Sequence, residues 1–210
     1  MILVFLIALD IATVIYSVFF GYYPNITLFD ATCYRILYIH VPLAWNMYIA
    51  FTLTFAFSLA YLLKENPKFD AVAFCSAVLG ILYGVGAIIS GMLWAKEVWG
   101  SYWSWDPRQT TTLTALLAYI GYLALRSSIL EIERARRISS VFGVSAYITI
   151  PLSFVSAVVV QSLHTQLPQQ PLGEEAHILL ALRVIVSFAT FLALLRMYYT
   201  SVMRKFEEKV

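Results

Sequence analysis

Six long apolar runs, separated by short polar or turn-forming segments, make up most of the chain. They span roughly 1–20, 39–63, 72–95, 110–130, 138–161 and 177–202. A helix needs about 20 mostly apolar residues to cross a bilayer, and backbone groups in hydrocarbon must be hydrogen-bonded within the protein. The alternation over about ten residues that is typical of barrel strands is not found. The pattern therefore predicts an all-α integral membrane protein, a six-transmembrane-helix bundle that forms one domain over residues 1–210.

The composition supports this prediction and excludes several classes of protein. Of the 210 residues, 61% are hydrophobic and 12% are charged, against about 45–50% and about 25% in soluble proteins. So large an apolar excess cannot be buried inside a chain of this length, and most of it must face lipid. A nucleic-acid-binding protein, a soluble enzyme and a disulfide-stapled secreted domain are excluded. Cys33 and Cys75 lie in no CxxC or CxxCH pattern, so no redox motif or covalent cofactor attachment is predicted.

The distribution of lysine and arginine predicts the orientation of the bundle, because these residues are enriched in cytoplasmic loops. Ten of them lie in the loops 64–70 and 126–137 and in the carboxyl-terminal segment. Three others, Arg35, Lys96 and Arg108, belong to the opposite side. Both termini are therefore predicted to be cytoplasmic (N-in/C-in). The loops expected to face outward are 21–39, 96–109 and 162–176.

The predicted outer face holds the side chains best suited to bind a ligand. All three histidines, His40, His164 and His177, lie at outer helix ends, and the segment 99–105 contains four aromatic residues. Histidine is a common metal ligand, and two of them could occupy both axial positions of an iron cofactor. The flat rings suit a polycyclic ligand, and Arg108 beside them suits its carboxylates. The alternatives are an aromatic belt at headgroup depth and solvated interface histidines.

Two charged residues are expected inside the spans, where a charge is costly. Asp10 lies in the middle of the first run, which lacks the basic start and the cleavage site of a signal peptide and is therefore expected to be a retained helix. Asp10 is a candidate site, or a carboxyl group paired with a neighbouring span. Arg183 lies six residues after His177, and it could extend to the interface, pair with an acid or bind a ligand carboxylate.

Three segments carry a resemblance to a known family. The sequence WGSYWSWDPRQT at 99–110 resembles the tryptophan-rich WWD signature of the haem-handling proteins of cytochrome c biogenesis. HVPLAW at 40–45 and SLHTQLP at 162–168 resemble the two histidine segments of the haem exporter protein C family within that superfamily. The chain length and the six spans resemble that family throughout. One position departs from the pattern, since Tyr102 replaces the first residue of the usual double tryptophan.

The resemblance implies a haem transporter or chaperone rather than an enzyme with its own catalytic residues. It implies that haem b is held at the outer face of the cell membrane between two axial ligands, His40 and His164. The implied platform consists of Trp99, Tyr102, Trp103, Trp105, Asp106 and Arg108. The implied partners are a membrane-anchored periplasmic haem chaperone, ABC-transporter subunits and a small membrane subunit of the maturation complex.

Three other functions are compatible with part of this pattern. A haem-lyase or synthase subunit of the second cytochrome c biogenesis system also carries a WWD motif and outer histidines, but it would need further spans and in-membrane histidines. A b-type transmembrane electron-transfer protein would place histidine pairs at two depths, whereas the histidines here lie at one depth. A solute transporter would call for interrupted helices or polar groups near the membrane centre, for which Asp10 alone is weak support.

Overall fold

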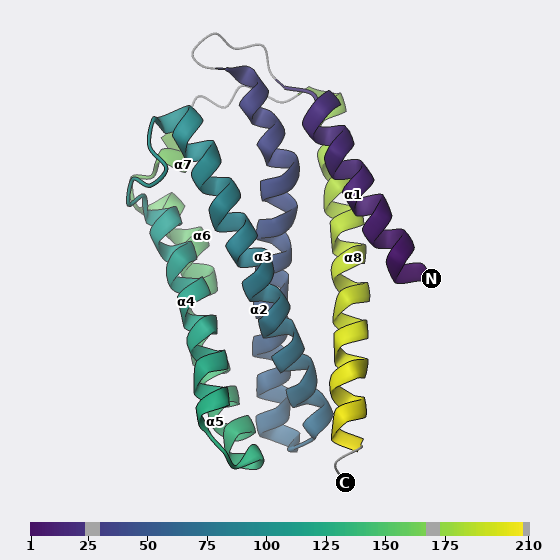
Figure 1. The fold of residues 1–210 in the computed structure, drawn as a ribbon. Helices are drawn as coiled ribbons and strands as arrows, with labels where there is room; N and C mark the ends of the chain where they lie inside the picture. Colours follow the sequence, from purple (N-terminus) through teal and green to yellow (C-terminus); the bar gives the residue numbers. More distant parts are fainter. Residues whose placement is uncertain (24–29, 167–172, 208–210) are drawn as a thin grey trace.

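A computed structural model describes residues 1–23, 30–166 and 173–207, and this part of the chain is helical throughout (Figure 1). The helices are α1 (Ile2–Phe20), the 3-10 helix η1 (Ala31–Ile36), α2 (Leu37–Lys64), α3 (Pro67–Trp99), α4 (Pro107–Ser128), α5 (Ile132–Ala146), α6 (Thr149–Val159), α7 (Leu163–Gln166) and α8 (Glu174–Glu207). The long helices run side by side, with α5 and α6 stacked end to end beside α4. Parts of two expected outer loops, 24–29 and 167–172, lie outside the described residues.

The predicted all-α membrane fold is confirmed, and the chain is a multi-pass membrane protein. Among the described residues, five helical segments are long and apolar enough to cross a bilayer: Ile2–Phe20, Ala31–Lys64, Pro67–Trp99, Ile132–Ser156 and Glu174–Lys205. The remaining expected span, 110–130, corresponds to α4, which begins with the polar sequence PRQTTT and packs against α3, α5 and α6. Large apolar side chains such as Phe19, Leu82 and Ile89 are exposed on the outside of the bundle, as expected for a surface that faces lipid.

The expected span 138–161 is not one helix, because it is divided between α5 and α6 at Tyr147 and Ile148. Pro151 accounts for the break. A proline has no backbone N–H, and its ring collides with the carbonyl four residues earlier, which here belongs to Tyr147. The expected loop 126–137 is also shorter than predicted, since α5 already begins at Ile132. Likewise α3 continues to Trp99, so the Trp-rich loop is confined to 100–106.

The centre of the bundle is formed by aromatic and small side chains between α2, α3 and α4. The rings of Phe51 and Tyr119 are stacked with centroids 3.8 Å apart and an interplanar angle of 4°. The Tyr119 hydroxyl donates to the Phe51 carbonyl at 3.2 Å, so this buried phenol is satisfied. Met47, Leu116 and Tyr122 extend the same cluster. This packing fixes α2 against α4 directly below the end of the bundle that carries the Trp-rich loop.

A buried ion pair joins α1, α2 and α8. Pro42 lies inside α2, so the carbonyl of Tyr38 has no N–H partner one turn later. Arg183, which is 3% exposed, donates to that carbonyl through Nε at 3.1 Å. Its Nη1 donates to both the Asp10 carboxylate and the Thr13 hydroxyl. The sequence left several roles open for Asp10 and Arg183. The structure shows that the two residues form an ion pair with each other.

A second network of charges closes the opposite end of the bundle. The Asp70 carboxylate is fully buried and accepts two hydrogen bonds from Arg126, at 2.6 and 2.7 Å. Arg136 lies 3.3 Å from the same carboxylate and also pairs with Glu133. These contacts join the start of α3 to the end of α4 and to α5. Three of the basic residues that predict a cytoplasmic face (Arg126, Arg136 and Arg137) are thus paired with acids in the structure.

The N-in/C-in orientation is a prediction that labelling of single cysteines can test. In a background with Cys33 and Cys75 replaced by serine, Ser101→Cys in the Trp-rich loop and Ile132→Cys at the start of α5 are both at exposed positions. We expect a membrane-impermeant maleimide to label position 101 in intact cells and position 132 only after permeabilisation. The reverse pattern would invert the bundle and contradict the outward placement of the site.

Candidate functional site

Four of the eight predicted site residues line one cavity, of about 70 Å³, at the end of the bundle that carries the Trp-rich loop. They are His40 from α2, Trp103 from the loop, Arg108 from α4 and His164 from α7. The cavity is much smaller than the roughly 300–1,000 Å³ of a site that encloses a drug-sized ligand. A large planar ligand could therefore be enclosed here only in part, with the remainder outside the cavity.

His40 is held in a single orientation by α3. Its Nδ1 lies 3.1 Å from the Ala87 carbonyl oxygen and 3.0 Å from the Ser90 hydroxyl. Because a carbonyl can only accept, Nδ1 carries the proton and donates. The Ser90 hydroxyl in turn donates to the carbonyls of Gly86 and Ala87, so it also accepts from His40. The neutral ring therefore keeps an unprotonated Nε2, the form in which imidazole binds a metal.

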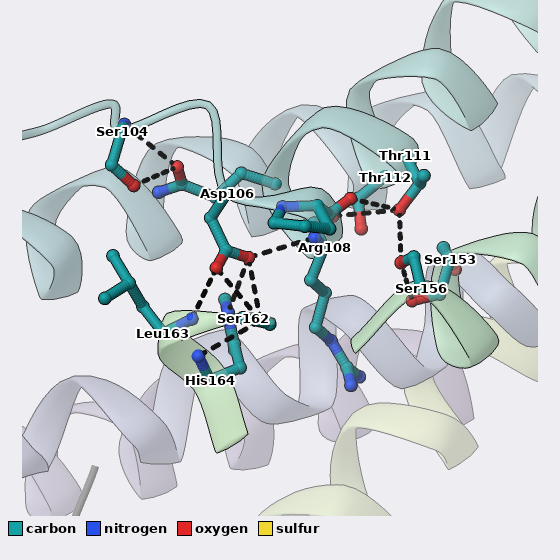
Figure 2. A network of polar contacts seen from close by, with 12 residues as sticks. Ser104, Asp106, Arg108, Thr111, Thr112, Ser153, Ser156, Ser162, Leu163 and His164 are labelled. Atoms are coloured by element: carbon teal, nitrogen blue, oxygen red, sulfur yellow. Dashed lines mark hydrogen bonds and ion pairs between the residues drawn. The ribbon is translucent and has the colours of Figure 1, made fainter. Parts of the chain in front are cut away.

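His164 is oriented by a carboxylate, as Figure 2 shows. Its Nδ1 lies 3.3 Å from Oδ1 of Asp106. Burial and the nearby Arg108 guanidinium lower the pKa of the His164 imidazole, and Asp106 opposes them only in part. The imidazole is therefore neutral at neutral pH, and its Nδ1–H donates to the carboxylate. A carboxylate in this position fixes the tautomer and makes the opposite nitrogen a stronger metal ligand.

Asp106 joins the start of α4 to the segment that carries His164. Its carboxylate accepts the backbone N–H of Arg108 as the N-cap of α4, at 2.9 Å. It also accepts the Ser162 hydroxyl and the Leu163 N–H, the latter at 2.6 Å. Burial raises the pKa of this carboxyl, but the hydrogen bonds that it accepts and the nearby His164 outweigh burial and leave the pKa below its ordinary value. Asp106 is thus ionised and positions His164 rather than lining the cavity.

The aromatic residues of the Trp-rich segment do not form one continuous surface. Trp103 lines the cavity, and Trp105 meets it edge to face at 5.8 Å but is 74% exposed. Trp99, at the end of α3, packs edge to face against the His164 ring at 4.9 Å. Tyr102 lies elsewhere, in a shallow cleft beside Lys96, whose ammonium is 5.7 Å from the centre of its ring. The segment therefore contributes one wall of the cavity and one support for His164.

Arg108 provides positive charge at the cavity. Its side chain extends away from the Asp106 carboxylate (Figure 2) and lies over the Phe154 ring at 5.4 Å. Within the described residues no carboxylate lies within ion-pair distance of this guanidinium. The neighbouring Gln109 instead holds the loop, since its Oε1 accepts both the backbone N–H and the hydroxyl of Ser104 at 3.1 Å. Arg108 is therefore available to bind an anionic group of a ligand.

Several residues of the site were not expected from the sequence. Gly91 of α3 lies against His40, and a Cβ there would be 3.0 Å from Cε1 of the ring, so a larger residue would crowd the imidazole. Trp94 also lines the cavity and packs edge to face on Tyr34 at 4.8 Å. Tyr48 lines the base and accepts the Ser153 hydroxyl at 3.0 Å. Nothing in the sequence around these three residues distinguishes them from the rest of the apolar runs.

The remaining polar residues that the sequence singled out lie outside the cavity. His177 is exposed at the start of α8, where its Nδ1 is 3.0 Å from the Gly173 carbonyl oxygen. Arg183 is occupied by Asp10, Thr13 and the Tyr38 carbonyl. His40 and His164 therefore share one cavity, and His177 does not line it.

Comparison with known proteins agrees with the resemblance seen in the three sequence segments. The family model described as Heme exporter protein C matches residues 1–209. Heme exporter protein C of Rhodobacter capsulatus is 29% identical over 175 residues, which are 82% of this chain and 72% of that protein. Its counterpart from Bradyrhizobium diazoefficiens is 34% identical over 119 residues, 56% of this chain and 45% of the relative. A ccmC-like mitochondrial protein of cytochrome c biosynthesis from Marchantia polymorpha is 28% identical over 166 residues, 79% of this chain and 70% of the relative. With a family match over almost its whole length, the chain belongs to the heme exporter protein C family.

Proposed function

We propose that this chain binds haem b as cargo at the outer face of the cell membrane and delivers it for cytochrome c maturation. The observation that carries the proposal is the pair of imidazoles in one cavity, each with Nδ1 bonded to an acceptor and Nε2 left without a proton. Haem supplies an iron that accepts nitrogen ligands on its two faces. His40 and His164 would be those ligands.

The other walls of the cavity fit the periphery of the same cargo. Trp94 and Trp103 present aromatic surface, and Arg108 presents a guanidinium suited to a propionate. The small size of the cavity supports a mode in which the centre of the ring lies between the two imidazoles and its outer edge stays accessible. Such partial enclosure suits a protein that must release its cargo to another.

The proposed recipient is a membrane-anchored periplasmic haem chaperone. ABC-transporter subunits and a small membrane subunit of the maturation complex are the other proposed partners. The support for these partners is family membership and the relatives named for cytochrome c biosynthesis and heme export. Trp105 and Tyr102 are exposed on the loop that would face such a recipient.

Replacing either axial histidine tests the ligand assignment. With both imidazoles bound, the iron should be six-coordinate and low-spin. We expect His40→Ala and His164→Ala each to leave a five-coordinate or water-ligated haem that is retained less well, with external imidazole partly restoring the low-spin absorption spectrum. His177→Ala is the matched control and should leave the spectrum unchanged. A His40→Ala or His164→Ala protein with full haem content and an unaltered low-spin spectrum would exclude that residue as a ligand.

The role of Asp106 can be separated from that of the ligands themselves. Asp106→Asn removes the charge that orients His164, and loss of such an outer hydrogen bond typically weakens metal binding by about 10–100-fold. We expect haem to dissociate faster by a factor in this range, as followed by transfer to apomyoglobin. Asp30→Asn is the matched control, because Asp30 also caps a helix on this face but contacts Thr32 rather than a histidine. Equal retention in the two variants would contradict the positioning role.

The two adjacent aromatic residues of the loop should differ in their effect on haem binding. Trp103 lines the cavity and Tyr102 does not. Loss of an aromatic contact costs about 0.5–1.5 kcal/mol beyond buried area, so Trp103→Leu should lower haem affinity at least several-fold in a titration. Tyr102→Leu should change it little. If the two substitutions weaken binding equally, both rings contact haem, and the separation of Tyr102 from the cavity does not hold in the haem-bound protein.

A further inference from the structure

A groove between the beginning of α1 and the last part of α8 lies at the other end of the bundle from the haem cavity. It encloses about 660 Å³. Figure 1 shows why the groove exists, since α1 crosses α8 at an angle and its first residues lie beside the middle of the longer helix. Ile2 and Leu3 form the α1 wall. The α8 wall is a single stripe made of Leu192, Ala193, Arg196, Met197, Thr200, Ser201 and Arg204.

Among the described side chains, the two arginines of this groove have no acidic partner, unlike the basic residues of the loops at the same end of the bundle. Arg126 and Arg136 pair with Asp70, and Arg137 pairs with Glu65. For Arg196 and Arg204 the described side chains include no carboxylate within 4.0 Å. Both guanidinium-bearing residues are exposed. They therefore leave two positive charges on one face of α8 to be balanced by something outside this part of the chain.

The sequence of α8 places these charges at the edge of the hydrocarbon layer. After Arg183 the helix is uncharged over 184–195, and Arg196 is the first charge that follows. Arg204 lies two turns further on, about 12 Å along the axis at 1.5 Å per residue. On the bilayer side of Arg196 the groove walls are apolar and exposed, with 45% of Leu192 and 74% of Ile2 accessible, and the exposed Met197 lies beside Arg196 itself. The occupant must therefore combine an anionic group at the membrane surface with apolar chains that enter the bilayer.

We propose that this groove binds one anionic phospholipid, with its phosphate between Arg196 and Arg204 and an acyl chain along Ile2 and Leu192. Basic pockets at the membrane surface of transmembrane helices have the chemistry that binds such headgroups. A free phosphate would use the arginines but not the apolar walls. A transmembrane helix of another protein would cover the walls but would leave two guanidinium groups unbalanced. The proposal does not depend on haem binding, because the cavity lies at the opposite end of the bundle.

Lipid retention by the full-length protein tests the proposal. The protein would be placed in mixed micelles with phosphatidylglycerol and phosphatidylcholine, and the lipids kept after dilution would be counted by native mass spectrometry. We expect the unaltered protein to keep one phosphatidylglycerol in preference to phosphatidylcholine. Each basic residue at a membrane surface contributes about 1 kcal/mol to anionic-lipid binding, or about five-fold. Arg196→Gln with Arg204→Gln should therefore lower the preference by more than ten-fold.

Lys205→Gln is the matched control, because Lys205 lies next to Arg204 on the same helix but outside the groove. It should lower the preference less than either arginine substitution does, because Lys205 does not line the groove. Thr200→Trp provides a second variant that keeps both charges but fills the space between them, and it should also abolish retention. An unchanged far-ultraviolet circular dichroism spectrum would show that each variant is folded.

Three results would overturn the proposal. The preference for phosphatidylglycerol could survive in both groove variants, which would place the lipid elsewhere. Lys205→Gln could reduce retention as much as the arginine substitutions, which would mean diffuse attraction to basic residues. Inorganic phosphate could displace the lipid from the unaltered protein at equal concentration, which would mean a site for the free anion. None of these results bears on the haem proposal, because that one is read from the absorption spectrum.

Discussion

Every polar group inside this bundle must find its partner within the protein, because the hydrocarbon offers no water. The contacts of Arg183 show how far this requirement determines the structure. Pro42 removes the helix partner of the Tyr38 carbonyl, Arg183 supplies a replacement donor, and Asp10 balances the charge that Arg183 brings. One missing N–H in α2 is thus compensated by residues of α8 and α1. The same proline fixes the turn of α2 that carries His40.

At the site this requirement is met for only one nitrogen of each histidine ring. The Nδ1 atoms of His40 and His164 are satisfied by the Ala87 carbonyl and the Asp106 carboxylate. What remains open toward the cavity is the other nitrogen of each ring and, within the described residues, the guanidinium of Arg108. Buried polar groups without partners are costly in an apolar setting. A ligand that offers both a metal and carboxylates would remove this cost.

The sequence predicted most of the architecture and four of the residues that line the cavity, and its failures have physical reasons. The apolar runs were sufficient to locate the membrane spans. The resemblance of two segments to a known family singled out His40 and His164, which line the cavity. The pairing of Asp10 with Arg183 could not be predicted, because 173 residues separate them and side-chain partners depend on helix packing. The separation of Tyr102 from Trp103 depends on loop backbone, with Gly100 at φ 79° and Trp105 at φ 57°. The break in the fifth span was signalled by Pro151, whose effect on Tyr147 follows from local geometry alone.

All five tryptophans of the chain lie at the end of the bundle that holds the cavity. Trp94 and Trp103 line it, Trp99 contacts His164, Trp105 contacts Trp103, and Trp45 follows the cavity residue Ala44 on α2. Intrinsic ultraviolet fluorescence therefore comes almost entirely from the surroundings of the site. A bound porphyrin absorbs at the wavelengths at which indole emits, and it would quench the tryptophan fluorescence by energy transfer. Tryptophan fluorescence should therefore report how much of the protein has haem bound at the cavity, without a label or a purified partner.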